Sequence, residues 1–267
     1  MHYDSIMPIP DRLNPTFAAS ASLTDPRAAA LEEARKRLIV ALDVPTAPAA
    51  IDLVNRLERD CLWFKVGMEL FTAAGPAAIE SIVARGHSVF LDLKFHDIPN
   101  TVAGAVRSAA ALGVRMVNVH ALGGPAMLAA ARQALDAVPD PPQLLAVTIL
   151  TSMDAAQLRA VSIGLDPSDA AEALARMSLE AGIRGFVCSP QEAARLRDLA
   201  GPDATLVIPG VRPAGAEASD QRRIATPAEA LRAGASYLVV GRPITQAPDP
   251  ADAAEAILDE MADALAA

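Results

Sequence analysis

The chain has 267 residues, of which 52% are hydrophobic and only 3% aromatic, and it carries a formal net charge of -9. This composition supports a large buried core and excludes a wholly disordered chain. The net negative charge excludes a broad basic surface that would bind nucleic acid or anionic membranes. The scarcity of aromatic residues argues against a surface on which the bases of single-stranded nucleic acid stack. The two cysteines, Cys61 and Cys188, form neither a disulfide framework nor a zinc-binding spacing, which favours a reducing cytoplasm.

The N-terminal segment mixes Pro, Ser, Asp and Asn without periodicity, and it lacks the basic start and apolar run of a secretory signal. No run of about 18 apolar residues occurs in the sequence, so we expect no transmembrane helix. We therefore expect a loosely ordered tail over 1–26 and a single catalytic domain over 27–267, led by a short helix near 27–37.

From Leu38 onward, short apolar runs alternate with Ala-rich stretches. The predicted strands are 38–43, 61–67, 87–94, 115–121, 143–150, 184–189, 205–210 and 237–242. The predicted helices are 47–59, 68–85, 100–112, 125–137, 168–182, 190–199, 227–234 and 250–265. Repeated strand–helix units imply right-handed crossovers and a parallel sheet, and eight of them in about 250 residues fit a closed (β/α)8 TIM barrel. A doubly wound open sheet is the alternative, although no GxGxxG follows the first strand.

Polar residues gather at the C-terminal ends of these strands, where such a barrel places its active site. They are Asp43, Lys65, Asp92, Lys94, Asp97, Asn118, His120, Thr151, Ser152, Arg212 and Arg242, the last of which follows Gly241. Asp92 and Lys94 are two residues apart and so share one face of a strand, and Lys65 on the neighbouring strand reaches the same layer. We predict an alternating array of Lys65, Asp92, Lys94 and Asp97. A buried ion-pair network without catalytic function is the alternative, although buried ion pairs are a poor route to stability.

Lysine usage favours the catalytic interpretation. Only three of the 23 basic residues are lysines, and two of them, Lys65 and Lys94, fall in this array. Lysine can donate a proton where arginine cannot.

A phosphate site is predicted at the loops that follow the last two strands, because barrels often bind phosphate there. Arg212 and Arg242 supply positive charge and Gly241 allows close approach of a backbone amide. An ordinary loop with two solvated arginines is the alternative. His87, His96 and His120 lack the spacing of a metal triad, which favours chemistry without a metal or other cofactor.

Seven short segments together carry a resemblance to a known family. In chain order they are ALD (41–43), FKVG (64–67), DLKFHDIPNT (92–101), LTSM (150–153), PGVRP (209–213), SDQRRI (219–224) and VVGRPI (239–244). The chain resembles the orotidine 5′-monophosphate decarboxylases of the shorter bacterial type over residues 37–260. The resemblance implies a cofactor-free carboxy-lyase that forms uridine 5′-monophosphate in pyrimidine biosynthesis, a homodimer with shared active sites, and a cytoplasmic location.

The resemblance also implies a role for each matching residue. Asp43 and Lys65 contact the ribose side of the nucleotide, and Lys94 protonates C6 of the pyrimidine beside Asp92. Asp97 and Thr101 reach the site of the partner subunit. Thr151, with Ser152 as the alternative, lies by the pyrimidine edge. The phosphate is held by Arg212, Gln221, Gly241 and Arg242, and the segment 211–223 is the expected lid.

Two other functions stay open. Related barrels that share DxKxxD act on phosphorylated keto-sugars with a metal ion. A non-catalytic nucleotide-binding barrel would bind its ligand without turnover.

Overall fold

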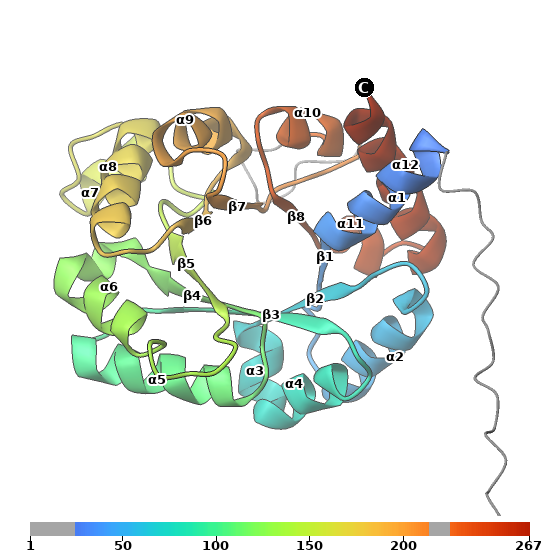
Figure 1. Ribbon diagram of the computed structural model, residues 1–267, viewed down its shortest axis with the longest axis horizontal. Helices are drawn as coiled ribbons and strands as arrows, with labels where there is room; N and C mark the ends of the chain where they lie inside the picture. The colour runs from blue at the N-terminus through green and yellow to red at the C-terminus, as the bar shows by residue number, and fades with distance from the viewer. Residues whose placement is uncertain (1–24, 214–224) are drawn as a thin grey trace, which may run out of the picture.

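The computed structural model describes residues 25–213 and 225–267. Within them, eight strands close into one parallel barrel in which each strand neighbours the next along the chain and β8 returns to β1 (Figure 1). The strands are β1 (Leu38–Ala41), β2 (Trp63–Gly67), β3 (Ser88–Phe95), β4 (Met116–His120), β5 (Gln143–Val147), β6 (Gly185–Val187), β7 (Thr205–Ile208) and β8 (Tyr237–Val240). The closed barrel confirms the predicted fold, and the alternative of an open doubly wound sheet is wrong.

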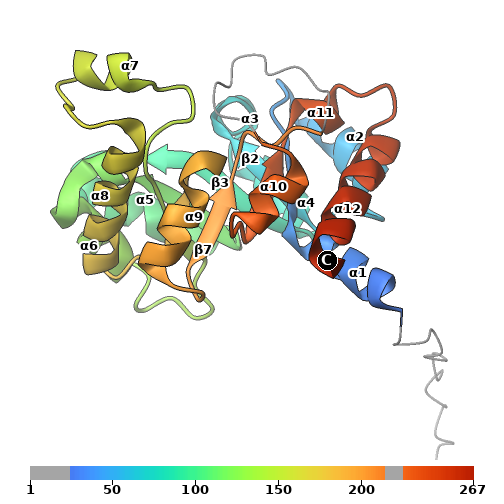
Figure 2. The same cartoon turned by 90° about the horizontal axis from the view of Figure 1, so that it is seen from above.

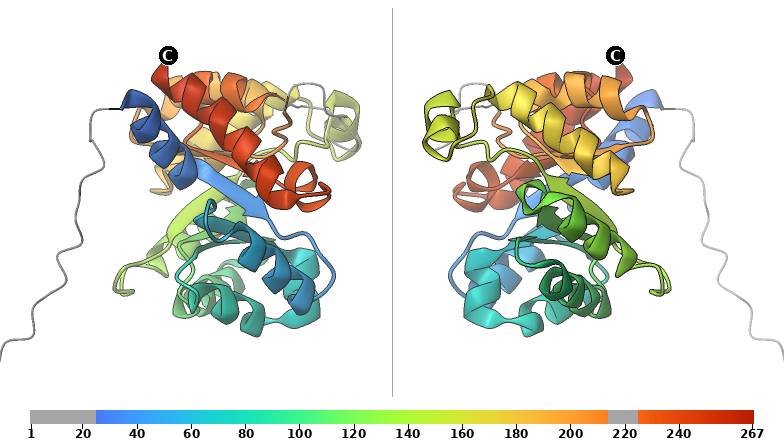
Figure 3. Two further views of the ribbon diagram at one scale, coloured as in Figure 1. Left: turned by 90° about the vertical axis from the view of Figure 1, so that its right-hand side faces the viewer. Right: turned by 90° about the vertical axis from the view of Figure 1, so that its left-hand side faces the viewer.

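Helices form an outer ring around the strands (Figure 1). They are α1 (Pro26–Arg37), α2 (Ala47–Leu57), α3 (Met68–Ala74), α4 (Pro76–Val83), α5 (Pro99–Ala111), α6 (Gly124–Gln133), α7 (Ala155–Ala160), α8 (Pro167–Glu180), α9 (Pro190–Ala200), α10 (Pro227–Arg232), α11 (Arg242–Thr245) and α12 (Pro250–Ala266), with a 3-10 turn η1 (Ala121–Gly123). The first and last helices, α1 and α12, lie side by side (Figure 3). Arg27 of α1 pairs with Asp259 of α12 at 2.9 Å. Figure 2 shows α7 standing beyond α8 at one end of the molecule.

Proline stands in the first turn of most of these helices, where its missing N–H would have had no partner in any case. Polar N-cap residues stabilise the N-termini of several of these helices. At α10, Thr226 accepts from the Glu229 amide while the Glu229 carboxylate accepts from the Thr226 amide. These signals place each helix directly after the loop that leaves a strand.

The core has two layers because alternate strand residues face opposite sides of the sheet. The inner layer fills the barrel with Ile39, Ala41, Phe90, Met116, Leu145, Val147, Val187, Val207 and Val239. The outer layer lies between strands and helices. Burial on both faces explains why the strands read as continuous apolar runs. Trp63 and Tyr237, with ring centroids 5.4 Å apart, stand at the start of their strands and pack against the inner layer.

The structure corrects some of the predicted bounds. The helix predicted over 68–85 is two helices, because Gly75 adopts a φ of 61° and Pro76 starts α4. The short helices α7 and α11 are not among the predicted helices. Residues 1–24 of the predicted tail and most of the predicted lid lie outside the described residues, so both stay predictions. Among the described residues, no helix is both long enough and apolar enough to span a membrane.

Candidate active site

A cavity of about 540 Å³ opens at the C-terminal ends of the strands. Residues from widely separated strands line it. The predicted site residues among them are Asp43, Lys65, Asp92, Lys94, Thr151, Arg212, Gly241 and Arg242. Ser152, the alternative to Thr151, is not part of this lining. Closure of the barrel thus brings together residues that are up to about 200 positions apart in the chain.

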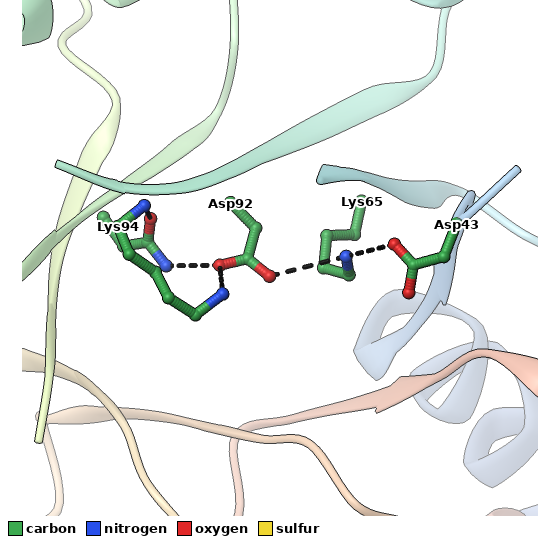
Figure 4. Close-up of polar contacts among 5 residues, drawn as sticks. Asp43, Lys65, Asp92 and Lys94 are labelled. Atoms are coloured by element: carbon green, nitrogen blue, oxygen red, sulfur yellow. Dashed lines mark hydrogen bonds and ion pairs between the residues drawn. The ribbon is translucent and has the colours of Figure 1, made fainter. Parts of the chain in front are cut away.

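Four of these residues form a chain of alternating charge (Figure 4). The Lys65 ammonium lies 2.7 Å from Asp43 Oδ1 and 3.4 Å from Asp92 Oδ2. The Lys94 ammonium lies 2.6 Å from Asp92 Oδ1. Three members of the predicted array, Lys65, Asp92 and Lys94, are therefore present, and Asp43 extends the array at the Lys65 end. The fourth, Asp97, is expected from the partner subunit and stays a prediction.

Burial makes the middle of this array electrostatically strong. The side chains of Lys65 and Asp92 are only 9% and 13% exposed. Burial is the largest influence on Lys65 and works against its charge, but Asp92 and Asp43 together raise its pKa above the ordinary value. Burial likewise opposes the charge of Asp92, while Lys65 and Lys94 hold its carboxyl pKa below the usual range. Both groups therefore stay ionised at neutral pH.

The backbone of β3 departs from a regular strand at this point. The β3–β4 ladder pairs Leu91 with Val117 and then Phe95 with Val119, so β3 bulges between them. Lys94 adopts a φ of 51°, a left-handed conformation that costs a non-glycine residue about 1–3 kcal/mol. The prediction that Asp92 and Lys94 lie together is confirmed, but the regular alternation used to reach it is wrong because the bulge sets their positions.

A buried amide supports the bulge. The Asn118 side chain donates to Asp92 Oδ1 and accepts from the Lys94 backbone N–H, both at 2.7 Å. From the sequence, Asn118 is predicted only as a polar residue on a strand. The available signal was an amide in the otherwise apolar stretch MVNV.

Gly67 is a second residue without a predicted role. A Cβ at this position would lie 2.8 Å from Lys65 Nζ and 2.9 Å from Asp43 Oδ1. The absence of a side chain therefore leaves room for that ion pair. The need for glycine at position 67 is visible only from these distances in the folded protein.

Two histidines stack beside the array. His96 and His120 have ring centroids 5.6 Å apart. Burial, helped by the neighbouring His96 and Lys94, lowers the pKa of His120 to about 4, so its ring is neutral at physiological pH. His120 Nδ1 accepts from the Leu122 amide.

The predicted phosphate residues lie at the part of the cavity formed by the ends of β7 and β8. Arg212 is buried, and its Nη1 donates to the Val211 carbonyl at 2.9 Å. Gly241 precedes α11, which starts with Arg242. Gln221 lies outside the described residues, so its predicted phosphate contact stays a prediction.

Asp97 and Thr101 are exposed and do not line the cavity of their own chain. Asp97 Oδ1 accepts from the Ile98 amide at 2.6 Å, and the Ile98 side chain is 67% exposed. Their predicted contribution to a partner subunit's site stays a prediction. Within residues 25–213 and 225–267, no cluster of three or more His, Cys, Asp and Glu side chains is arranged to hold a metal ion.

Comparison with known proteins identifies the family. Residues 36–257 match the family model described as orotidine 5′-phosphate decarboxylase / HUMPS family. An orotidine 5′-phosphate decarboxylase of Nitrosospira multiformis is 55% identical over 80% of this chain and 89% of its own length. One from Moorella thermoacetica is 54% identical over 85% of this chain and 93% of its own length.

A solved structure agrees with these sequence matches. The crystal structure of the orotidine 5′-phosphate decarboxylase from Lactobacillus acidophilus superposes with a TM-score of 0.74 at 40% identity. The match covers 84% of this chain and 98% of that chain. The chain belongs to the orotidine 5′-phosphate decarboxylase / HUMPS family.

Proposed function

We propose that this protein decarboxylates orotidine 5′-monophosphate to uridine 5′-monophosphate and CO2, the last step of de novo pyrimidine nucleotide synthesis. The proposal rests above all on one observation: a lysine ammonium is held 2.6 Å from a buried carboxylate in the cavity at the C-terminal end of the barrel. The curated relatives named orotidine 5′-phosphate decarboxylase support the choice of substrate.

The chemistry explains why a positioned cation is needed. Breaking the bond between C6 and the carboxylate releases CO2 and leaves the electron pair on C6, in an orbital that lies in the ring plane. That pair does not delocalise into the ring, so stabilisation comes from charge placed beside C6. Lys94 supplies that charge and then transfers one proton from its ammonium to C6, which completes the product.

The size of this effect is substantial. Two opposite unit charges 4 Å apart attract by about 4 kcal/mol at an effective dielectric constant of about 20. That energy corresponds to roughly three orders of magnitude in rate. Lys94 is already ordered by Asp92, so little reorganisation is needed when the charge develops on C6.

The remaining residues bind and align the nucleotide. Asp43 and Lys65 hold the ribose, and Thr151 contacts the pyrimidine edge. Arg212, Gln221, Gly241 and Arg242 bind the phosphate, whose binding energy aligns C6 with Lys94. Asp92 faces the substrate carboxylate and orients Lys94.

We further propose that the active enzyme is a cytoplasmic homodimer. Asp97 and Thr101 then reach the partner's site, which explains why both are exposed on a single chain. No cofactor takes part in the proposed reaction.

The test is ultraviolet-monitored turnover of orotidine 5′-monophosphate, with and without EDTA. We expect loss of substrate and formation of uridine 5′-monophosphate at a rate that the chelator does not change. A folded protein with no turnover would contradict the proposal, and a metal-supplemented screen of keto-sugar phosphates would then follow. Turnover that EDTA abolishes would contradict the cofactor-free mechanism.

A further inference from the structure

We propose that Asn118 is a positioning residue for the decarboxylation: its carboxamide holds the bulged backbone at Lys94 and aims the Asp92 carboxylate at the Lys94 ammonium. This inference rests on the function proposed above. It concerns a residue of β4 that does not line the cavity and that acts through Asp92 and Lys94.

The bulge creates the need for such a residue. Leu91 pairs with Val117 and Phe95 with Val119, so residues 92–94 of β3 stand opposite Asn118 alone. Because a single residue of β4 faces three residues of β3, β4 does not offer a backbone carbonyl to each of the three N–H groups. The carboxamide oxygen of Asn118 accepts the Lys94 N–H at 2.7 Å and so takes the place of a ladder bond. It thereby stabilises the left-handed conformation of Lys94, whose φ is 51°.

The nitrogen of the same amide orients the carboxylate. Asp92 Oδ1 receives two donors, Asn118 Nδ2 at 2.7 Å and Lys94 Nζ at 2.6 Å. Asp92 Oδ2 is left to face Lys65 Nζ at 3.4 Å. The two oxygens of Asp92 thus face different lysines (Figure 4). The Asn118 amide therefore fixes which carboxylate oxygen faces which lysine.

Burial makes these two bonds decisive. The Asn118 side chain is fully buried, so water does not replace either bond when the amide is removed. Leucine has a similar size but neither donates nor accepts. Aspartate accepts the Lys94 N–H but, when ionised, presents a second negative charge to Asp92. Only a neutral group that both donates and accepts satisfies the geometry.

The test compares steady-state kinetics and product binding of N118L and N118D with those of the parent. We expect N118L to lower kcat by about 10²-fold, as expected for a reacting group displaced by about 1 Å. The dissociation constant for uridine 5′-monophosphate should change by less than about threefold, because no nucleotide-binding residue is altered.

The pH profile of N118D separates positioning from a purely structural role. We expect the ratio of its kcat to that of the parent to rise as pH falls from 8 to 5, because the protonated new carboxyl group donates to Asp92 while still accepting from Lys94. The other titratable groups around the position are Lys65 on β2, His96 at the end of β3 and His120 on β4. Taking the ratio at each pH removes their contribution, since both proteins contain them.

Two control variants account for stability and charge. Thr148→Val removes a buried hydrogen bond from Thr148 Oγ1 to the Val187 carbonyl and should lower the melting temperature without changing kcat. Asn55→Asp adds the same charge as N118D, but on the exposed surface of α2, and should leave both the melting temperature and kcat unchanged.

A folded N118L with the parent's kcat would overturn the proposal, as would a flat N118D ratio across the pH range. If both variants fail to fold, hydrogen exchange of the Lys94 backbone amide in the parent still tests whether Asn118 holds that N–H. Strong protection is expected, and a freely exchanging amide would overturn the proposal. Failure of the proposed function is distinct, because it appears as absence of turnover in the parent itself.

Discussion

Gly67→Ala tests the geometry of the charged array with a single added carbon atom. Gly67 has a φ of -92°, which alanine adopts readily, so the substitution brings no backbone strain. The new Cβ would instead lie 2.8 Å from Lys65 Nζ and 2.9 Å from Asp43 Oδ1. We expect a folded protein with a disturbed ion pair.

The distances set the size of the effect. Comfortable non-bonded contacts are about 3.5–4.0 Å, so Lys65 Nζ must retreat by roughly 0.7 Å or more. Its bonds at 2.7 Å to Asp43 and 3.4 Å to Asp92 do not both survive such a shift. Since a displacement of about 1 Å costs on the order of 10²-fold in rate, we expect kcat/KM to fall by between about tenfold and 100-fold.

The assay is decarboxylation kinetics beside a thermal melt. Gly164→Ala is the matched control, because a Cβ there meets nothing within 4 Å and should change neither measurement. A Gly67→Ala protein that melts like the parent and retains the parent's kcat/KM would refute the reasoning that the Asp43–Lys65 geometry matters for turnover.

Further predictions test the phosphate site, the shared site and the ionisation of the array. Arg242→Ala should weaken binding of the phosphorylated nucleotide, and titration calorimetry that finds the parent's affinity would contradict the phosphate assignment. Lys94→Ala and Asp97→Ala should each abolish turnover, yet mixed dimers should regain part of it because one intact site remains; confirmed mixed dimers without activity would count against a shared site. The parent should melt above Asp92→Asn at neutral pH, and this difference should shrink below about pH 4. The reason is that the lowered carboxyl pKa of Asp92 contributes stability above the ordinary value, which is lost as pH falls through the folded value. A difference in melting temperature that stays constant from pH 7 to pH 3 would contradict this.

The repeating apolar runs determined the barrel from sequence alone. Strand and helix periodicities depend on neighbours a few residues apart, so they can be read locally. Because all parallel strands end on the same side of a closed barrel, the polar residues after each strand also predicted the cavity. The segment DLKFHDIPNT then pointed to the family that the comparisons identify.

Tertiary structure decided how these residues meet. Regular alternation along a strand predicts that Asp92 and Lys94 lie together, whereas a bulge opposite Asn118 and a left-handed Lys94 produce the contact. The predicted array also omitted Asp43, which the structure pairs with Lys65 at 2.7 Å. Both differences have one physical reason: distances between strands are set by closure of the barrel and by bonds across it, which local periodicity does not encode. The same reason hid Asn118 and Gly67, whose importance lies in the atoms that the fold places beside them.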